Sequence, residues 1–92
     1  MFYVYVIKSR RDSRLYTGYT NDLRRRFLEH NGKIGRPSKS TKPRAPFDLL
    51  YYEAYVSQAD AKQREHNLKH SAGARTALKR RIPNGLRSGH FV

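Results

Sequence analysis

The segment "LYTGYTNDLRRRFLEH", residues 15–30, predicts a strand that leads directly into a helix. The strand covers about 15–19 and places Tyr16 and Gly18 on one face. A glycine inside a strand is typical of a place where a ligand or another backbone comes close. The Thr-Asn-Asp run that follows supplies capping residues, so we expect a helix that continues to about Asn31 before Gly32 ends it.

The helical periodicity places one of three consecutive arginines beside the buried face. Leu23 and Phe27 form the apolar stripe, and Arg26 and His30 lie next to it, one turn apart. Two other arginines point away from the stripe and are interpreted as solvated charges or phosphate contacts: Arg24 and Arg25.

Two further strands and two further helices are predicted outside this segment. Residues 2–8 and 47–56 are rich in aromatic and β-branched residues, and their side chains are expected to alternate strictly between two faces. Ser57 with Asp60 resembles a capping box that opens a helix to about residue 70, and a shorter helix covers about 72–81.

The predicted order of elements is therefore β-β-α-β-α-α. This order indicates an α+β fold, a small three-stranded antiparallel or mixed sheet with helices packed on it. We expect residues 1–82 to form a single domain and residues 83–92 to form a flexible basic tail, because that end is rich in turn residues and charge.

The charge of the chain indicates a polyanionic partner. Its 92 residues include 20 lysines and arginines against 7 acids, a formal net charge of +13. Nucleic acid is favoured over a membrane surface, because no long amphipathic helix suited to a membrane surface is present. Cysteine is absent, which excludes disulfides, thiolate-bound zinc and a thiol nucleophile. No apolar run approaches membrane length, so we expect a soluble, cytoplasmic protein with no membrane partner.

A mobile basic loop is expected over residues 32–46, which hold five basic residues, three prolines and no acid. Together with basic residues near the carboxyl end, the loop is expected to hold the nucleic-acid backbone without reading bases. These residues are Lys33, Arg36, Lys39, Lys42, Arg44, Lys79, Arg80 and Arg81.

One carboxylate of the 57–70 helix is predicted to face inward, namely Glu65. A small domain seldom buries charges without a use, so Arg26 and Glu65 are candidates for a site over one patch of the sheet, beside Tyr5 and Tyr16. The structural alternative is an ion pair between Arg26 and Glu65 at the margin of the core. His30 taken alone is better explained by capping of carbonyls or interaction with the dipole at the end of its helix.

At these residues the chain resembles the GIY-YIG nuclease superfamily, over roughly residues 2–69. "YVY" at 3–5 and "YTG" at 16–18 stand where the family has its two tripeptides, although Tyr3 replaces a glycine that is not catalytic in the family. Arg26 and His30 follow at the family spacing, and Glu65 matches the metal-binding glutamate. The chain looks most like the small, stand-alone, single-domain bacterial branch.

The resemblance implies a metal-dependent endonuclease that hydrolyses phosphodiester bonds in DNA. Arg26 would clamp the scissile phosphate, and Glu65 would bind one divalent ion, Mg²⁺ or Mn²⁺. Either tyrosine could serve as the base if neighbouring cations lower its pKa, and Glu53 is a weaker candidate for a second acid. The implied catalytic residues are Tyr5, Tyr16, Arg26, His30 and Glu65.

Two alternatives remain open at this stage. The chain could be a non-catalytic nucleic-acid-binding module, for DNA or RNA, on the same scaffold. A weaker alternative is an obligate partner protein that uses exposed tyrosines as interface anchors.

Overall fold

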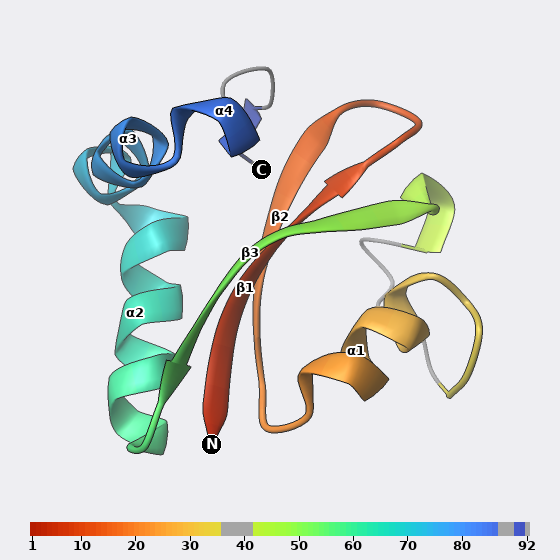
Figure 1. Ribbon diagram of the computed structural model, residues 1–92, viewed down its shortest axis with the longest axis horizontal. Coiled ribbons are helices and arrows are strands. Elements are labelled where there is room, and N and C mark those ends of the chain that lie inside the picture. The colour runs from red at the N-terminus through yellow and green to blue at the C-terminus, as the bar shows by residue number, and fades with distance from the viewer. Residues whose placement is uncertain (36–41, 87–89, 92) are drawn as a thin grey trace.

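The computed structural model describes residues 1–35, 42–86 and 90–91 of the chain. The three long strands and three long helices follow each other in the order that the sequence predicts (Figure 1). The elements are β1 (Phe2–Ser9), β2 (Arg14–Thr20), α1 (Leu23–His30), the 3₁₀ turn η1 (Lys42–Arg44), β3 (Phe47–Tyr55), α2 (Gln58–His70), α3 (Ala72–Arg81), α4 (Pro83–Leu86) and β4 (His90–Phe91).

The sheet has the strand order β3-β1-β2-β4. The central strand β1 pairs antiparallel with both β2 and β3, which confirms the predicted three-stranded sheet. The two-residue strand β4 adds a short parallel pairing with Arg14 and Leu15, which the sequence did not predict. The rest of β2 therefore has no second neighbouring strand in the part of the chain that the structure describes.

The two faces of the sheet are covered by different helices (Figure 1). Helices α2 and α3 lie on one side and α1 lies on the other. On the α2–α3 side a cluster that we call the apolar core is formed by Val4, Val6, Leu15, Ala61, Leu68, Leu78 and Leu86. On the α1 side a smaller cluster is formed by Tyr5, Ile7 and Phe47, with Leu23 and Phe27 packed against it.

The expected alternation of side chains is interrupted in β3. The register between β1 and β3 shifts between Val6, which pairs with Tyr51, and Ile7, which pairs with Leu49. Leu50 is the additional residue of this β-bulge, and it packs against the apolar core together with Tyr51. Strict alternation was therefore wrong here, because a bulge places two successive residues toward one side.

Part of the segment that the sequence predicts to be a flexible tail packs against the sheet in the residues that the structure describes. Residues 83–86 form a short helix, and Leu86 is buried in the apolar core. Phe91 packs against the same core beside β2. Turn residues made this segment look unstructured, but burial of two large apolar side chains holds it against the sheet.

The helix starts follow the predicted capping residues. The carboxylate of Asp22 accepts a hydrogen bond from the amide of Arg25 and caps α1, and Ser57 caps α2 in the same way through Asp60. Gly32, which follows the end of α1, has a φ of +70°, a conformation that favours glycine. No helix among the described residues is both long and apolar enough to cross a membrane.

Candidate active site

A pocket of about 170 Å³ lies along the part of β2 that β4 leaves uncovered. All five side chains that the sequence singled out as catalytic contribute to its lining, which places them in one location. They are Tyr5, Tyr16, Arg26, His30 and Glu65. We call this location the edge pocket.

The pocket collects side chains from both sides of the sheet. Arg26 and His30 come from α1, whereas Glu65 comes from α2, and these two helices cover opposite faces (Figure 1). Arg26 and Glu65, which were predicted to come together over one patch of the sheet, thus come together around the edge of β2. An open strand edge allows this, because side chains from both faces can reach past it.

Gly18 allows the ring of Tyr5 to lie across β2. A Cβ atom at residue 18 would stand 2.3 Å from the ring carbon Cζ of Tyr5, far closer than packed atoms approach. The ring is 3% exposed, and the Tyr5 hydroxyl lies 2.7 Å from Nε2 of His30. The glycine in the second tripeptide therefore has a steric role, because it makes room for the Tyr5–His30 pair.

Burial decides the protonation of this pair. Burial raises the pKa of Tyr5 to about 12, although the Arg26 guanidinium partly opposes the shift by its charge and a hydrogen bond. Burial, assisted by repulsion from Arg26, lowers the pKa of His30 to about 4. At neutral pH the phenol is therefore protonated and the imidazole is neutral, and the Tyr5 hydroxyl and Nε2 of His30 share one hydrogen bond. Arg26 does act to lower the pKa of Tyr5, as the sequence suggested that a neighbouring cation could, but desolvation outweighs it.

Each charged side chain in the pocket has an ion-pair partner on its own helix. A guanidinium nitrogen of Arg26 lies 2.9 Å from Oε1 of Glu29, and Nζ of Lys69 lies 3.1 Å from Oε2 of Glu65. The alternative interpretation foresaw Arg26 and Glu65 pairing with each other. Pairing within each helix leaves both charges facing the same space from opposite walls.

Two residues of this arrangement were missed from sequence. Glu29 and Lys69 stand three and four residues after the side chains that they pair with, the spacings that bring helical neighbours together. That spacing was visible in the sequence and could have identified both residues.

The comparisons with known proteins agree with this geometry. A family model described as the GIY-YIG catalytic domain matches residues 1–82. This chain belongs to the GIY-YIG nuclease family. Membership in the GIY-YIG family implies a nucleic-acid substrate, DNA.

The relatives are small proteins of similar size. The UPF0213 protein OB0043 of Oceanobacillus iheyensis is 40% identical over 67 residues, which is 73% of this chain and 74% of the relative. A UPF0213 protein of the archaeon Haloquadratum walsbyi is 42% identical over 67 residues, 73% of this chain and 72% of the relative. The solution NMR structure of the UPF0213 protein BH0048 from Bacillus halodurans superposes with a TM-score of 0.54 and 30% identity, covering 96% of this chain and 92% of that one.

GIY-YIG nucleases typically use a divalent metal, and the oxygen donors of the edge pocket are suited to Mg²⁺ or Mn²⁺. In the described part of the chain, no three His, Cys, Asp or Glu side chains form a cage for an ion. Mg²⁺ does not need one, because it binds through one or two carboxylates and otherwise keeps waters or takes phosphate oxygens. Glu65 supplies one carboxylate. The hydroxyl of Thr17 in the same lining is a buried oxygen without a hydrogen-bond partner among the described residues.

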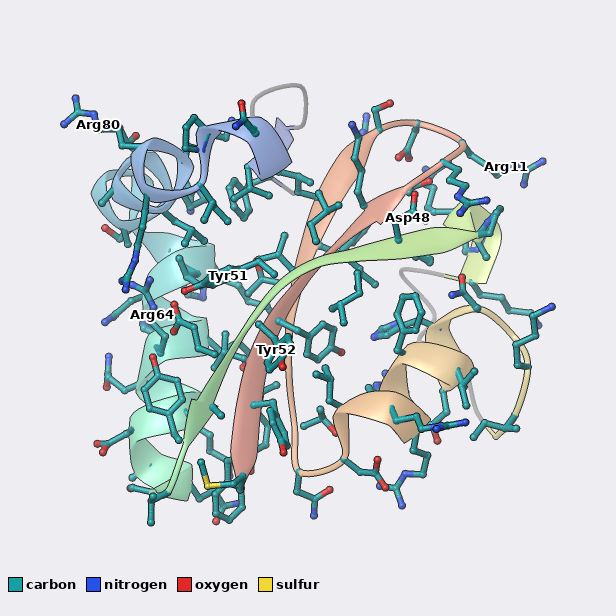
Figure 2. The ribbon with its side chains drawn as sticks, in the orientation of Figure 1. Arg11, Asp48, Tyr51, Tyr52, Arg64 and Arg80 are labelled. Atoms are coloured by element: carbon teal, nitrogen blue, oxygen red, sulfur yellow. The ribbon has the colours of Figure 1, made fainter. Side chains whose placement is uncertain are left out.

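Glu53, the weaker candidate for a second acid, lines a different hollow. Its carboxylate accepts hydrogen bonds from the hydroxyls of Tyr51 and Tyr55, and Arg64 binds it through two nitrogens. Tyr51 and Arg64 lie together on the α2 side of β3 (Figure 2). Since Glu53 is held by three side chains away from the edge pocket, it is a structural residue of this GIY-YIG domain.

The basic residues predicted to bind nucleic acid are divided between two sides of the sheet. Arg24 and Arg25 are exposed on α1, whereas Arg80 on α3 points outward on the far side (Figure 2). Arg44 pairs with Asp12 at 3.2 Å. The exposed residues also include Lys33, Lys42 and Arg81, and Lys79 lies over the ring of Phe91. Arg36 and Lys39 lie outside the described residues.

Proposed function

We propose that this chain is a metal-dependent endonuclease that hydrolyses phosphodiester bonds in DNA, in repair or recombination, choosing its substrate by shape rather than by sequence. The observation that carries the proposal is the edge pocket. Arg26 and the Tyr5–His30 pair line it from one side of the sheet, and Glu65 lines it from the other. A phosphodiester at the edge of β2 would be contacted by all of them.

Arg26 is proposed to hold the scissile phosphate. A guanidinium donates two parallel hydrogen bonds to a phosphate, a geometry that lysine cannot reproduce. The carboxylate of Glu29 accepts a hydrogen bond from one guanidinium nitrogen and so orients Arg26. The charge that develops on the phosphoryl oxygens would then be stabilised by a donor already in place.

The Tyr5–His30 pair is proposed to accept the proton of the attacking water. The water oxygen bonds to phosphorus as the ester P–O bond breaks, and the water proton passes to the oxygen of Tyr5. In the neutral tautomer whose Nε2 carries no proton, His30 would in turn accept the proton of Tyr5 across their 2.7 Å contact. The departing oxygen takes a proton from solvent. Tyr16, whose ring packs against Phe47, would position the phosphate.

Glu65 is the proposed ligand of the divalent ion, with the Thr17 hydroxyl on the same wall. When bound, Mg²⁺ or Mn²⁺ supplies positive charge that polarises the phosphoryl oxygen. Lys69 pairs with Glu65 and orients its carboxylate. The ammonium group of Lys69 would contact the phosphate from the wall opposite Arg26.

The exposed basic residues are proposed to bind the nucleic-acid backbone. Binding through phosphate contacts releases counterions, so the affinity should fall steeply as salt is raised. The exposed amides of Gln63 and Asn67 on α2 bond to each other, which supports recognition by shape rather than by reading the major groove.

A cleavage assay with matched variants tests this function. Purified protein is incubated with Mg²⁺ or Mn²⁺ and a panel of single-stranded, nicked, branched and duplex DNA, with and without EDTA. We expect Arg26→Ala and Glu65→Gln each to lower the cleavage rate by roughly 10²-fold or more, with most binding retained. The controls are Arg25→Ala in the same arginine run and Asp60→Asn on the same helix as Glu65, both exposed. Equal losses in the controls, or cleavage that persists in EDTA, would refute the proposal.

The second candidate is a non-catalytic binding module for DNA or RNA. The observation that favours it is the charge balance of the pocket, where Arg26 and Glu65 are each neutralised on their own helix. Pure protein that binds DNA or RNA tightly and salt-sensitively, but cleaves no substrate with either metal, would establish this candidate instead.

A further inference from the structure

A second hollow lies on the α1 side of the sheet, between the beginning of α1 and strands β1 and β3. Its volume is about 390 Å³. It is lined by Tyr3, Asn21, Asp22, Leu23, Arg24 and Tyr52. Tyr52 projects from β3 toward this side, opposite to Tyr51 (Figure 2).

Tyr52 is left uncovered because of the way Tyr5 packs. In the sheet register Tyr52 stands beside Tyr5, and Tyr5 stands beside Gly18 on the next strand. The ring of Tyr5 lies over Gly18, so it leans toward β2 and away from β3. Tyr52 remains 53% exposed, one of four large apolar side chains in the described residues that are left so open. The glycine that admits Tyr5 to the edge pocket thus also leaves an aromatic ring open on the neighbouring strand.

The hollow combines an aromatic surface with a cation. The rings of Tyr3 and Tyr52 meet edge to face, with their centroids 6.1 Å apart, which fixes the orientation of Tyr52. Arg24 lines the same hollow and is exposed, and Arg25 beside it is exposed as well. Asn21 contributes an amide that can both donate and accept a hydrogen bond. An aromatic ring beside a cation is the arrangement that holds an unstacked base and its phosphate.

We propose that this hollow receives an unpaired nucleobase, which stacks on Tyr52 while Arg24 contacts the adjoining phosphate. The net charge of +13 favours a polyanion over a protein or an apolar ligand as the occupant. The proposal deepens the proposed function and rests on it in one respect, namely that the strand held here is the one whose phosphodiester reaches the edge pocket.

The position of the hollow defines a class of substrate. Tyr3 and Tyr5 are two residues apart on the same face of β1, so the hollow and the edge pocket are separated by roughly 7 Å along that strand. A base inside a duplex is stacked on its neighbours and cannot reach a protein ring without leaving the helix. The preferred substrates are therefore those with unpaired nucleotides next to the cleaved bond, such as single-stranded ends, flaps and loops.

The test measures binding with no divalent cation present, so that it does not depend on cleavage. Equilibrium affinities for a short fluorescent single strand, and for its duplex, are compared among the wild type, Tyr52→Ala and Tyr52→Phe. Val56→Ala is the matched control, because Val56 follows the same strand and is 84% exposed but has no ring. A strand carrying 2-aminopurine reports stacking directly through quenching of its fluorescence.

We expect Tyr52→Ala to weaken single-strand binding by roughly five- to hundred-fold, the range for loss of one stacked base, and to abolish the quenching. Duplex binding should change much less, and Tyr52→Phe and Val56→Ala should behave as the wild type. Equal losses for single strand and duplex would overturn the proposal. Unchanged single-strand binding in Tyr52→Ala would also overturn the proposal. If that variant in addition lost self-association in sedimentation, the face around Tyr52 would be an interface between two copies of the chain. If stacking is observed but no variant or wild-type protein cleaves DNA, the proposed function fails and the binding site stands.

Discussion

The apolar core and the edge pocket lie in the same small sheet but are built from different chemistry. The apolar core joins seven buried side chains, all of them hydrocarbon, from three helices and two strands. The edge pocket instead collects a buried phenol, a neutral imidazole and two pairs of opposite charges around a single strand edge. Core residues gain free energy from burial, whereas polar groups in the pocket must find partners to offset their desolvation.

This difference indicates a division of labour between stability and chemistry. A fully buried leucine contributes about 1.5–3 kcal/mol relative to an exposed one, and the apolar core holds four of them. The pocket leaves the Thr17 hydroxyl without a partner among the described residues, which costs stability, and it lowers the pKa of His30, which costs stability only in acid. Burial in the apolar core thus offsets the free energy that the polar groups of the pocket, such as the Thr17 hydroxyl, cost on folding.

The largest expected effect comes from breaking the apolar core. Leu68→Ala removes a side chain with no exposed surface and should lower the free energy of unfolding by about 2–5 kcal/mol in urea denaturation. Gln63→Ala, exposed on the same helix, should stay within about 0.5 kcal/mol of the wild type. The pKa of His30, followed by NMR, should not change in Leu68→Ala. A return of that pKa toward 6.5 would show that the two regions are not independent.

A second expected effect is a loss of stability in acid that originates in the pocket. The pKa of His30 is lowered from 6.5 to about 4 in the folded chain, so the unfolded chain binds the extra proton first as the pH falls. The free energy of unfolding is unaffected by protonation of His30 above pH 6.5. It falls by about 3 kcal/mol in total as the pH is lowered from 6.5 to 4. Burial is the largest cause of the lowered pKa of His30, Arg26 adds to it by repulsion, and Glu29 opposes it; the Tyr5 hydroxyl lies against the same imidazole.

Urea denaturation at several pH values measures this loss. His30→Gln should remove that part of the pH dependence, whereas His66→Ala, at an exposed position of α2, should retain it. An NMR titration in which His30 protonates near pH 6.5 would contradict the buried, neutral imidazole.

The smallest expected effect has the opposite sign. Thr17→Val keeps the shape of the side chain but removes the buried hydroxyl that has no protein partner among the described residues, so stability should rise by about 1 kcal/mol. Thr20→Val is the matched control on the same strand, because the Thr20 hydroxyl accepts a hydrogen bond from the amide of Asp22 at 3.0 Å. That variant should lose about 1 kcal/mol. Equal destabilisation of both variants in thermal unfolding would show that the Thr17 hydroxyl is already satisfied.

Local periodicity was enough to predict most of the fold and the membership of the site. The spacing of Leu23, Arg26 and His30 on one helix follows from 3.6 residues per turn, and Tyr5 and Ile7 share a strand face because strands repeat every two residues. These rules involve only neighbours in the chain, so they hold before anything packs. The α+β order and five of the residues that line the edge pocket could therefore be named from the sequence, with the family resemblance marking those five as a catalytic set.

Contacts between distant segments decided the rest. Only packing shows that the tail docks Leu86 and Phe91, that Leu50 forms a bulge, and that Arg26 and Glu65 meet around a strand edge from opposite faces. The protonation of Tyr5 and His30 belongs to the same class, because a pKa depends on which groups exclude water and which charges approach. The sequence by itself determined which side chains share a face; the tertiary structure alone decided what covers them, since desolvation and pairing arise only when remote segments come together.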